Sequence, residues 1–166
     1  VRVLVEKSLG RPISEAYAEF DDVAIASASI GQVHRAKLHD GTAVVVKVQH
    51  AGIEAKVNED MEVMAGLAVL ADRIPDLAAW KPQVLVEQLS RSLKRELNFS
   101  RELQNLQNFS RALVNFKGVR IPRSFPQLST SRILTMEYIE GVAVNKISHE
   151  VSSNEQRQAI AKLAAE

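Results

Sequence analysis

Two short stretches of the chain carry residue types that could bind phosphate. Residues 26–33 read Ala-Ser-Ala-Ser-Ile-Gly-Gln-Val, and residues 44–47 are three valines followed by a lysine. A hairpin loop of small residues lets its backbone approach phosphate oxygens closely. A lysine at the end of the next strand can place an ammonium group beneath them. The spacing therefore predicts a phosphate-covering hairpin with a basic group under it.

Alanines stand in this loop where glycines are expected. Ala26 and Ala28 each add a methyl group and disfavour left-handed backbone geometry, which predicts a stiffer loop. Gly31 keeps a glycine at the position nearest the returning strand, and an Asp40-Gly41 turn precedes the valine strand. These residues leave an alternative open, namely a surface hairpin followed by a lysine that emerges into solvent.

A lysine at the end of a buried strand needs a partner, because an unpaired buried charge is costly. From Phe99 onward apolar residues recur at helical spacing, and Glu102 lies at the edge of that stripe. Glu102 is therefore predicted to point along the seam between helix and sheet. Glu96 and Asn98 lie on other faces of a continuous helix. Each of the three could equally be structural, with Asn98 as the cap of a helix that begins at Phe99.

Four segments together resemble the UbiB family of atypical protein kinases, also called the AarF-domain family. Residues 26–36 resemble its alanine-rich loop A-x-A-S-I-G-Q-V-H-R-A, and residues 44–49 its V-A-V-K-V-Q strand. Residues 96–105 resemble its E-L-D-F-x-x-E-x-x-N helix, and residues 135–141 the strand and hinge that follow. The alanine-rich loop is highly specific to this family. The segments cover most of the chain.

The fold expected is α+β: a protein-kinase-like N-lobe with a five-stranded antiparallel sheet, an αC-like helix and an extra inserted long helix. The C-lobe is expected to be largely missing. We expect an N-terminal helical extension over 1–24 and the N-lobe over 25–139, with a helical insertion about 52–80. A hinge and the start of the C-lobe should occupy 140–166.

The residue pattern predicts the individual elements. Helices are expected over 1–9, 12–20, 53–74 and 82–114, the last of which a break near Asn98 would divide. Three strands are expected within 25–49, and two more at 119–122 and 131–137.

The resemblance also implies roles for individual residues. Lys47 would contact the phosphates and pair with Glu102, and these two are the catalytic candidates. Glu96 and Asn98 would belong to the family's E-x-D motif, in which Asn98 replaces the aspartate and puts an ionic role there in doubt. Met136 would be the gatekeeper. The candidate nucleotide-binding residues are Ala26, Ser27, Ala28, Ser29, Ile30, Gly31, Gln32, Val33, Val45, Lys47, Met136, Glu137, Tyr138 and Ile139.

The cofactor implied is ATP or ADP with Mg²⁺, whose ligands are expected outside this chain. The family's K-x-G-Q, H-x-D-x-H-x-G-N and D-F-G motifs do not occur in the sequence, so a fragment or a truncated form is expected. This chain alone is therefore expected not to turn over ATP. No metal site is predicted within it.

Composition is that of a globular module, with 46% hydrophobic residues. A net charge of +1 argues against nucleic acid as a partner, and the absence of cysteine excludes disulfides and cysteine zinc sites. No apolar run is long enough to span a membrane. We therefore expect a cytoplasmic chain whose membrane association, with lipid or quinone-pathway proteins as partners, would come from regions outside it.

The resemblance implies an ATP-binding lobe of an atypical kinase or ATPase, linked to isoprenoid quinone biosynthesis or lipid homeostasis. A regulatory module that binds nucleotide without phosphotransfer is the alternative. A helical interaction domain unrelated to kinases would require all four motif matches to be coincidental.

Overall fold

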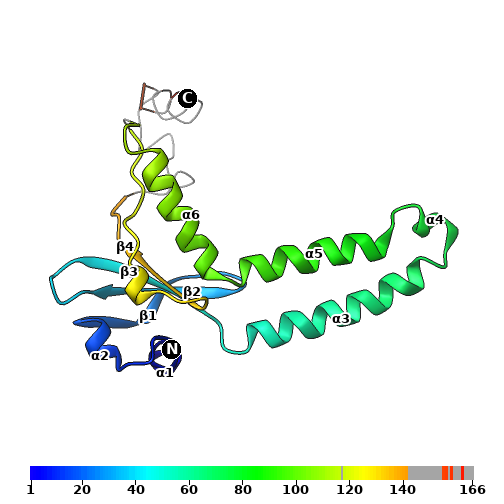
Figure 1. Cartoon of the computed structure of the whole chain (residues 1–166), viewed down its shortest axis with the longest axis horizontal. Coiled ribbons are helices and arrows are strands. Elements are labelled where there is room, and N and C mark those ends of the chain that lie inside the picture. The colour runs from blue at the N-terminus through cyan, green and yellow to red at the C-terminus, as the bar shows by residue number, and fades with distance from the viewer. Residues whose placement is uncertain (117, 142–154, 157, 159–161, 163–166) are drawn as a thin grey trace.

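The computed structural model describes residues 1–116, 118–141, 155, 156, 158 and 162. One antiparallel sheet of four strands, ordered β1-β2-β3-β4, forms its centre (Figure 1). The strands are β1 (Glu19–Ser27), β2 (Gly31–Lys37), β3 (Ala43–Gln49) and β4 (Ile133–Glu137). The predicted α+β arrangement around an antiparallel sheet is confirmed, although β1 begins earlier than the pattern predicted.

The valine run of β3 makes it a central strand, paired with β2 on one side and β4 on the other. β-Branched residues fit a pleated surface that is covered on both faces. The turn before β3 forms as expected. The Asp40 carboxylate accepts a hydrogen bond from the Thr42 N–H at 2.8 Å, and Gly41 has a φ of 86°, which favours glycine.

The prediction of five strands is wrong by one. No strand forms at 119–122 in the described part of the chain; instead Ser124 makes an isolated bridge to Met136. Two further backbone bonds hold this segment beside β4, from Phe125 N–H to Thr135 O at 3.0 Å and from Glu137 N–H to Arg123 O at 2.8 Å. Prolines at 122 and 126 bracket the segment, and because proline has no N–H to donate, pairing cannot extend past them.

Two short N-terminal helices, α1 (Arg2–Leu9) and α2 (Ile13–Ala16), cover one face of the sheet (Figure 1). Helix α1 ends at Gly10 in left-handed geometry, as the C-cap pattern predicted. Helix α2 is shorter than the predicted 12–20, because β1 already begins at Glu19. The main core lies under these helices and consists of Val5, Ile13, Ala16, Tyr17, Ala36, Val44, Val46, Val48, Phe125, Leu128 and Ile133.

A buried polar link joins this core to the 3-10 helix η1 (Pro126–Leu128). The Thr135 hydroxyl donates to Leu128 O at 2.6 Å, so the Tyr17 hydroxyl, 2.8 Å away, must donate to the Thr135 oxygen. Burial raises the pKa of the Tyr17 phenol, which keeps this donor protonated.

The predicted helical region 82–114 is two helices, α5 (Pro82–Glu96) and α6 (Phe99–Ala112). They meet at a sharp bend, and α6 rises from the side of the sheet opposite α1 and α2 (Figure 1). Asn98 lies at the bend and is the N-cap of α6. Helix α6 occupies the position of αC in a kinase N-lobe.

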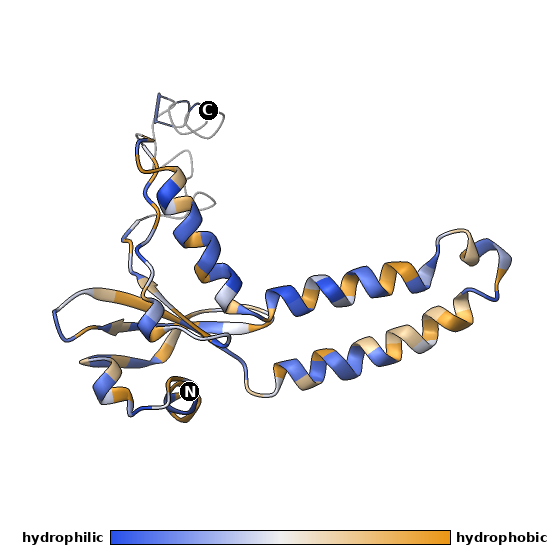
Figure 2. Cartoon of the chain, in the orientation of Figure 1, coloured by the Kyte–Doolittle hydropathy of each residue, from blue (hydrophilic) through white to orange (hydrophobic). Residues whose placement is uncertain are grey.

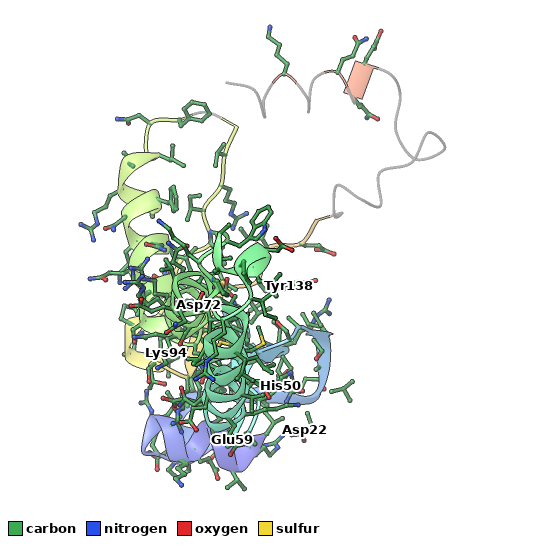
Figure 3. The ribbon with its side chains drawn as sticks, turned by 90° about the vertical axis from the view of Figure 1, so that its right-hand side faces the viewer. Asp22, His50, Glu59, Asp72, Lys94 and Tyr138 are labelled. Carbon is green, nitrogen blue, oxygen red and sulfur yellow. The ribbon has the colours of Figure 1, made fainter. Side chains whose placement is uncertain are left out.

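The insertion between β3 and α6 is a helical hairpin that extends away from the sheet (Figure 1). Its arms are α3 (Ile53–Ala71) and α5, and the short α4 (Pro75–Ala78) lies at the tip. The predicted extra helix is therefore present, but it is paired with α5 rather than standing alone. Figure 3 looks along the hairpin from its tip, with labels on Glu59 of α3, on Asp72 just after α3 and on Lys94 of α5.

Candidate functional site

The strand register collects several predicted site residues on one face of the sheet. Lys47 lies opposite Val33 on β2 and Leu134 on β4. Val45, two residues before Lys47, lies opposite Met136 in the next row. Because side chains on a strand point to the same face at every second residue, these side chains share the face that α6 covers.

The predicted partner of Lys47 is present. The Lys47 ammonium lies 2.6 Å from the Glu102 carboxylate, and the two side chains are 23% and 40% exposed. Glu102 comes from the first turn of α6, so the ion pair joins that helix to β3 across 55 residues of sequence. Partial burial strengthens such a pair relative to one on the open surface.

An aromatic ring contacts the same ammonium. The Lys47 Nζ lies 4.6 Å from the centre of the Phe99 ring, within the range of a cation–π contact. Phe99 is buried at the first residue of α6, and its N–H donates to Ser131 O at 2.9 Å. Phe99 therefore anchors α6 to the sheet and positions the Lys47 head at the same time.

Gln49 ties the bend between α5 and α6 to the end of β3. Its buried side-chain amide donates to Leu97 O and, at 3.3 Å, to Ser131 O. Leu97 O is a carbonyl at the C-terminal end of α5, where intrahelical partners run out. The bend is thus held in one place, and with it the start of α6.

The alanine-rich loop closes in a tight turn between β1 and β2. Ala28 N–H donates to Gly31 O at 2.8 Å. His50, just after β3, holds the loop tip with two bonds: its N–H donates to Ile30 O at 3.1 Å and its Nε2–H to Ala28 O at 3.0 Å. The loop is consequently fastened to the strand that carries Lys47. Ala26, Ser27, Ala28 and Ser29 are exposed, while Ile30, Gln32 and Val33 are half-buried.

Gly31 has a steric reason to be glycine. A Cβ at this position would lie 2.6 Å from Val48 O, closer than real Cβ atoms come, and 3.3 Å from Gln49 Cα, which is a tight contact. The loop backbone therefore crosses the end of β3 at a distance that only glycine allows.

The predicted hinge residues have their own partners. Glu137 N–H donates to Arg123 O, and Tyr138 N–H donates to Ala43 O at 3.0 Å. The Arg35 guanidinium lies 4.6 Å from the Tyr138 ring and donates to its hydroxyl at 2.6 Å. Ile139 is exposed. The N–H groups of Glu137 and Tyr138 therefore already donate to carbonyls of the protein. A ligand would have to bond to other backbone groups of the hinge.

The Glu137 carboxylate secures the segment before the isolated bridge. It accepts a bond from Arg123 N–H at 3.2 Å and forms an ion pair with Arg120. The bond from Arg123 N–H and the Arg120 charge together hold the pKa of the Glu137 carboxyl below its usual range.

A pocket of about 360 Å³ opens beside Lys47 and Glu102. It extends from the loop tip to the bend between the two helices. Asn98 lies on its wall and accepts a bond from Ser100 N–H at 3.0 Å, so this member of the predicted motif serves as a helix cap. The lining residues are Ile30, Lys47, Ser92, Arg95, Glu96, Asn98, Arg101, Glu102 and Asn105.

Sequence reasoning did not find the roles of Gln49, His50 and Phe99. Gln49 and His50 were visible only as polar residues that end a valine strand, and Phe99 only as an apolar helix position. Their partners lie far away in sequence, so no local pattern points to the contacts.

The described residues offer no metal site of their own, since no group of three or more His, Asp or Glu side chains gathers there. A basic pocket with a lysine suits phosphate oxygens. Any Mg²⁺ would need further ligands from the nucleotide or from elsewhere. No helix in the described ranges is long and apolar enough to cross a membrane.

Comparison with known proteins agrees with this geometry. AarF domain-containing protein kinase 1 of Xenopus laevis is 35% identical over 167 residues, which cover 98% of this chain and 32% of that protein. A probable protein kinase UbiB of Xylella fastidiosa is 32% identical and aligns with 96% of this chain and 29% of its own length. The chain thus spans about a third of the length of these relatives.

A solved structure has the same fold. Rv3197 of Mycobacterium tuberculosis, determined in complex with erythromycin, superposes with a TM-score of 0.78 at 29% sequence identity. The match covers 96% of this chain and 40% of Rv3197. Residues 1–166 match the ABC1 atypical kinase-like domain. From the loop, the lysine–glutamate pair and these matches, the chain belongs to the ABC1 family of atypical kinase-like proteins, which includes AarF-domain and UbiB proteins.

Proposed function

We propose that this chain is the nucleotide-binding lobe of an ABC1-type kinase or ATPase. The observation that carries the proposal is the 2.6 Å ion pair between Lys47 and Glu102, next to a hairpin tip fastened by His50. In protein kinases the equivalent pair orients the lysine toward the α- and β-phosphates of ATP.

In this proposal the loop over residues 26–33 covers the phosphates and Lys47 contacts them. Val45 and Met136 lie along the adenine, and the hinge around Tyr138 meets its edge. The sheet register supports this division, because it puts Val33, Val45, Lys47 and Met136 on one face. Magnesium, when bound, neutralises phosphate charge, and its protein ligands would lie outside this chain.

By its likeness to the UbiB family, we place the activity in isoprenoid quinone biosynthesis or lipid homeostasis. Membrane lipid and quinone-pathway proteins are the partners proposed for the whole protein, in a cytoplasmic or membrane-associated setting. Catalytic phosphotransfer would require groups outside this sequence, because Lys47 and Glu102 position phosphates but supply no base.

Titration of the chain with Mg-ATP tests the proposal. We expect Lys47→Ala to weaken binding by at least about tenfold, because the variant loses the phosphate contact and leaves Glu102 unpaired. Lys56→Ala removes an exposed lysine on α3 and serves as the charge-matched control. Equal affinity in wild type and Lys47→Ala would contradict the proposal. A phosphate-release assay on the same proteins should show no turnover above the Lys47→Ala level.

A further inference from the structure

The pocket beside Lys47 holds more positive charge than the kinase-like pair accounts for. Arg95, in the last turn of α5, and Arg101, in the first turn of α6, both line it. The bend at 97–98 brings them to the same pocket from two different helices. Within the described ranges, neither guanidinium has a hydrogen bond or an ion pair.

The cationic side chains near Arg95 and Arg101 either have an acidic partner or lie outside this pocket. Lys47 is already matched by Glu102 at 2.6 Å. Arg91, one turn before Arg95, pairs with Glu87 at 3.6 Å. Lys94 lines a separate pocket on another side of α5. The unmatched charge is therefore concentrated at Arg95 and Arg101.

The charges of the lining residues favour an anion. The pocket contains three cationic side chains and two carboxylates, Glu96 and Glu102, which leaves one positive charge. Guanidinium groups bind phosphate oxygens in a bidentate manner and cannot lose their charge at physiological pH. The loop tip reaches the pocket through Ile30, so an anion there would lie under the hairpin.

We propose that Arg95 and Arg101 form an anion subsite that holds the terminal phosphates of the nucleotide, beyond the phosphates that Lys47 contacts. This inference rests on the proposed function and adds that the site distinguishes nucleotides by the number of their phosphates. In this proposal a triphosphate places phosphates at both Lys47 and the two arginines, whereas a monophosphate places its single phosphate at Lys47. The subsite therefore favours triphosphates over monophosphates.

The test compares Mg-ATP with AMP in calorimetric titrations of the chain. The double variant Arg95→Gln/Arg101→Gln should weaken Mg-ATP binding by about tenfold or more and change AMP binding by less than about twofold. Lys94→Gln is the matched control, because it removes one positive charge from the same turn of α5 outside the pocket. It should leave both affinities unchanged. Both arginines are exposed, so thermal melts should show that all variants fold.

The outcomes separate this inference from the proposed function. If the double variant binds Mg-ATP as wild type does while Lys47→Ala loses binding, the subsite is refuted and the nucleotide site stands. An equal loss of Mg-ATP and AMP affinity would also refute it, since terminal phosphates would not be the target. If the wild-type chain and Lys47→Ala bind Mg-ATP equally, the proposed function fails and the subsite fails with it.

Discussion

Gly31 has two structural roles in this site. It ends the alanine-rich loop and also lets the loop backbone pass over β3. We expect Gly31→Ala to lower the free energy of unfolding by about 2–4 kcal/mol, because its Cβ would collide with the carbonyl of Val48.

Gly66 provides the matched control for this substitution. It lies within α3 with open space around it, so Gly66→Ala should raise the free energy of unfolding by about 0.5–1 kcal/mol. Urea denaturation measures both variants. A Gly31→Ala chain as stable as wild type would show that the crossing of loop and strand can relax.

Phe99 is the second residue with two purposes, as a core side chain and as the aromatic neighbour of Lys47. Phe99→Leu should cost about 1–2 kcal/mol of unfolding free energy, because it leaves a void and removes the cation–π contact. Phe109, in the same helix, is 57% exposed, so Phe109→Leu should cost less than about 0.5 kcal/mol. Equal effects of the two substitutions in chemical denaturation would argue against this account of Phe99.

At the scale of elements, α6 is attached to the sheet at its N-terminal end. The Asn98 cap, the Phe99 N–H and the Gln49 amide all act within its first residues or at the bend before it. The Lys47–Glu102 pair follows one turn later. These contacts hold the αC-like helix in the position where Glu102 pairs with Lys47.

The Glu137 carboxylate adds side-chain contacts with Arg120 and Arg123 to the backbone bonds that hold the segment before β4. Its pKa is lowered in the folded chain, so its contribution to stability is complete above the unfolded pKa and is lost as pH falls through the folded pKa. The difference in unfolding free energy between wild type and Glu137→Gln should therefore be largest near about pH 7 and shrink toward about pH 3.

Denaturation across this pH range measures the Glu137 effect. Glu59→Gln, which removes an exposed carboxylate on α3, controls for the general loss of a negative charge. A Glu137→Gln difference that stays constant with pH, or grows as pH falls, would mean that the carboxylate does not secure this segment.

At the scale of the whole molecule, the hairpin presents a large exposed apolar surface. Residues 63–71 of α3 contain no charged side chain, so this part of the helix is apolar around its whole circumference (Figure 2). Trp80, beside the tip, is 73% exposed. Other exposed apolar side chains of the hairpin are Val63, Met64, Leu67, Val69, Leu70, Ile74, Leu77, Val84, Leu85 and Leu89.

We expect charged substitutions at exposed positions of the hairpin to leave its stability nearly unchanged. Leu67→Lys/Leu70→Lys should change the unfolding free energy by less than about 0.5 kcal/mol, since both side chains are 56% exposed, and should reduce binding of an apolar-surface dye. Ala68 is buried where α3 packs on α5, so Ala68→Lys should reduce helicity in far-UV circular dichroism. Loss of helicity in the double leucine variant would show that this face is packed.

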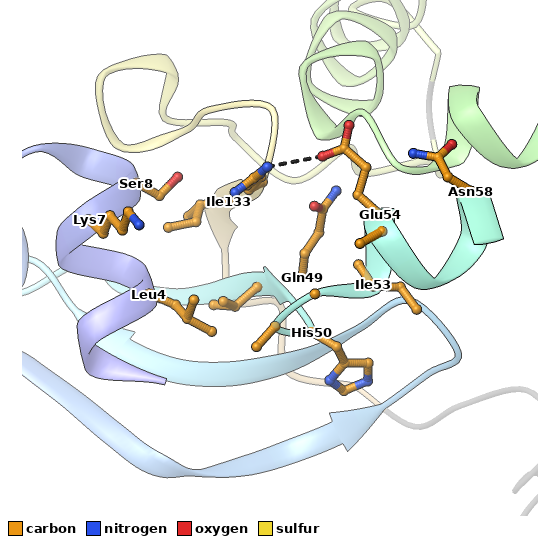
Figure 4. A pocket seen from close by; sticks show the side chains of 14 residues that line it. Leu4, Lys7, Ser8, Gln49, His50, Ile53, Glu54, Asn58 and Ile133 are labelled. Atoms are coloured by element: carbon orange, nitrogen blue, oxygen red, sulfur yellow. Dashed lines mark hydrogen bonds and ion pairs between the residues drawn. The ribbon is translucent and has the colours of Figure 1, made fainter.

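A second pocket, of about 460 Å³, lies between α1, the end of β3 and the start of α3 (Figure 4). Leu4, Lys7 and Ser8 line it from α1, and Glu54 lines it from α3 and pairs with Arg132 at 3.0 Å. Gln49 also lines this pocket, and its side-chain amide donates to Leu97 O at the bend between α5 and α6. The C-terminal end of β3 therefore contacts both the α1 side of the molecule and the bend between α5 and α6.

Features that depend on local chemistry could be predicted from the sequence. The valine run predicted a buried strand, Asp40-Gly41 a hairpin turn, Gly10 a helix C-cap and Asn98 a possible N-cap. The helix periodicity put Glu102 at the edge of the apolar stripe, and the family resemblance assigned it to Lys47 as its partner. The phosphate site that the loop and the lysine indicate stays a prediction. Each of these rests on neighbours within a few residues or on a regular repeat, so a linear pattern contains the information.

Only the tertiary structure decided the features that depend on distant contacts. The segment at 119–122 reads as a strand, but pairing with β4 is confined to residues 123–125, between Pro122 and Pro126, where Ser124 forms a bridge to Met136. Helices α3 and α5 pair because the chain reverses at the hairpin tip, which periodicity alone does not reveal. Gln49, His50 and Phe99 acquire their roles from carbonyls and a charge brought to them by other elements. Hydrogen bonds and ring contacts between distant residues depend on how the elements are arranged in space. Backbone propensity depends only on the local sequence.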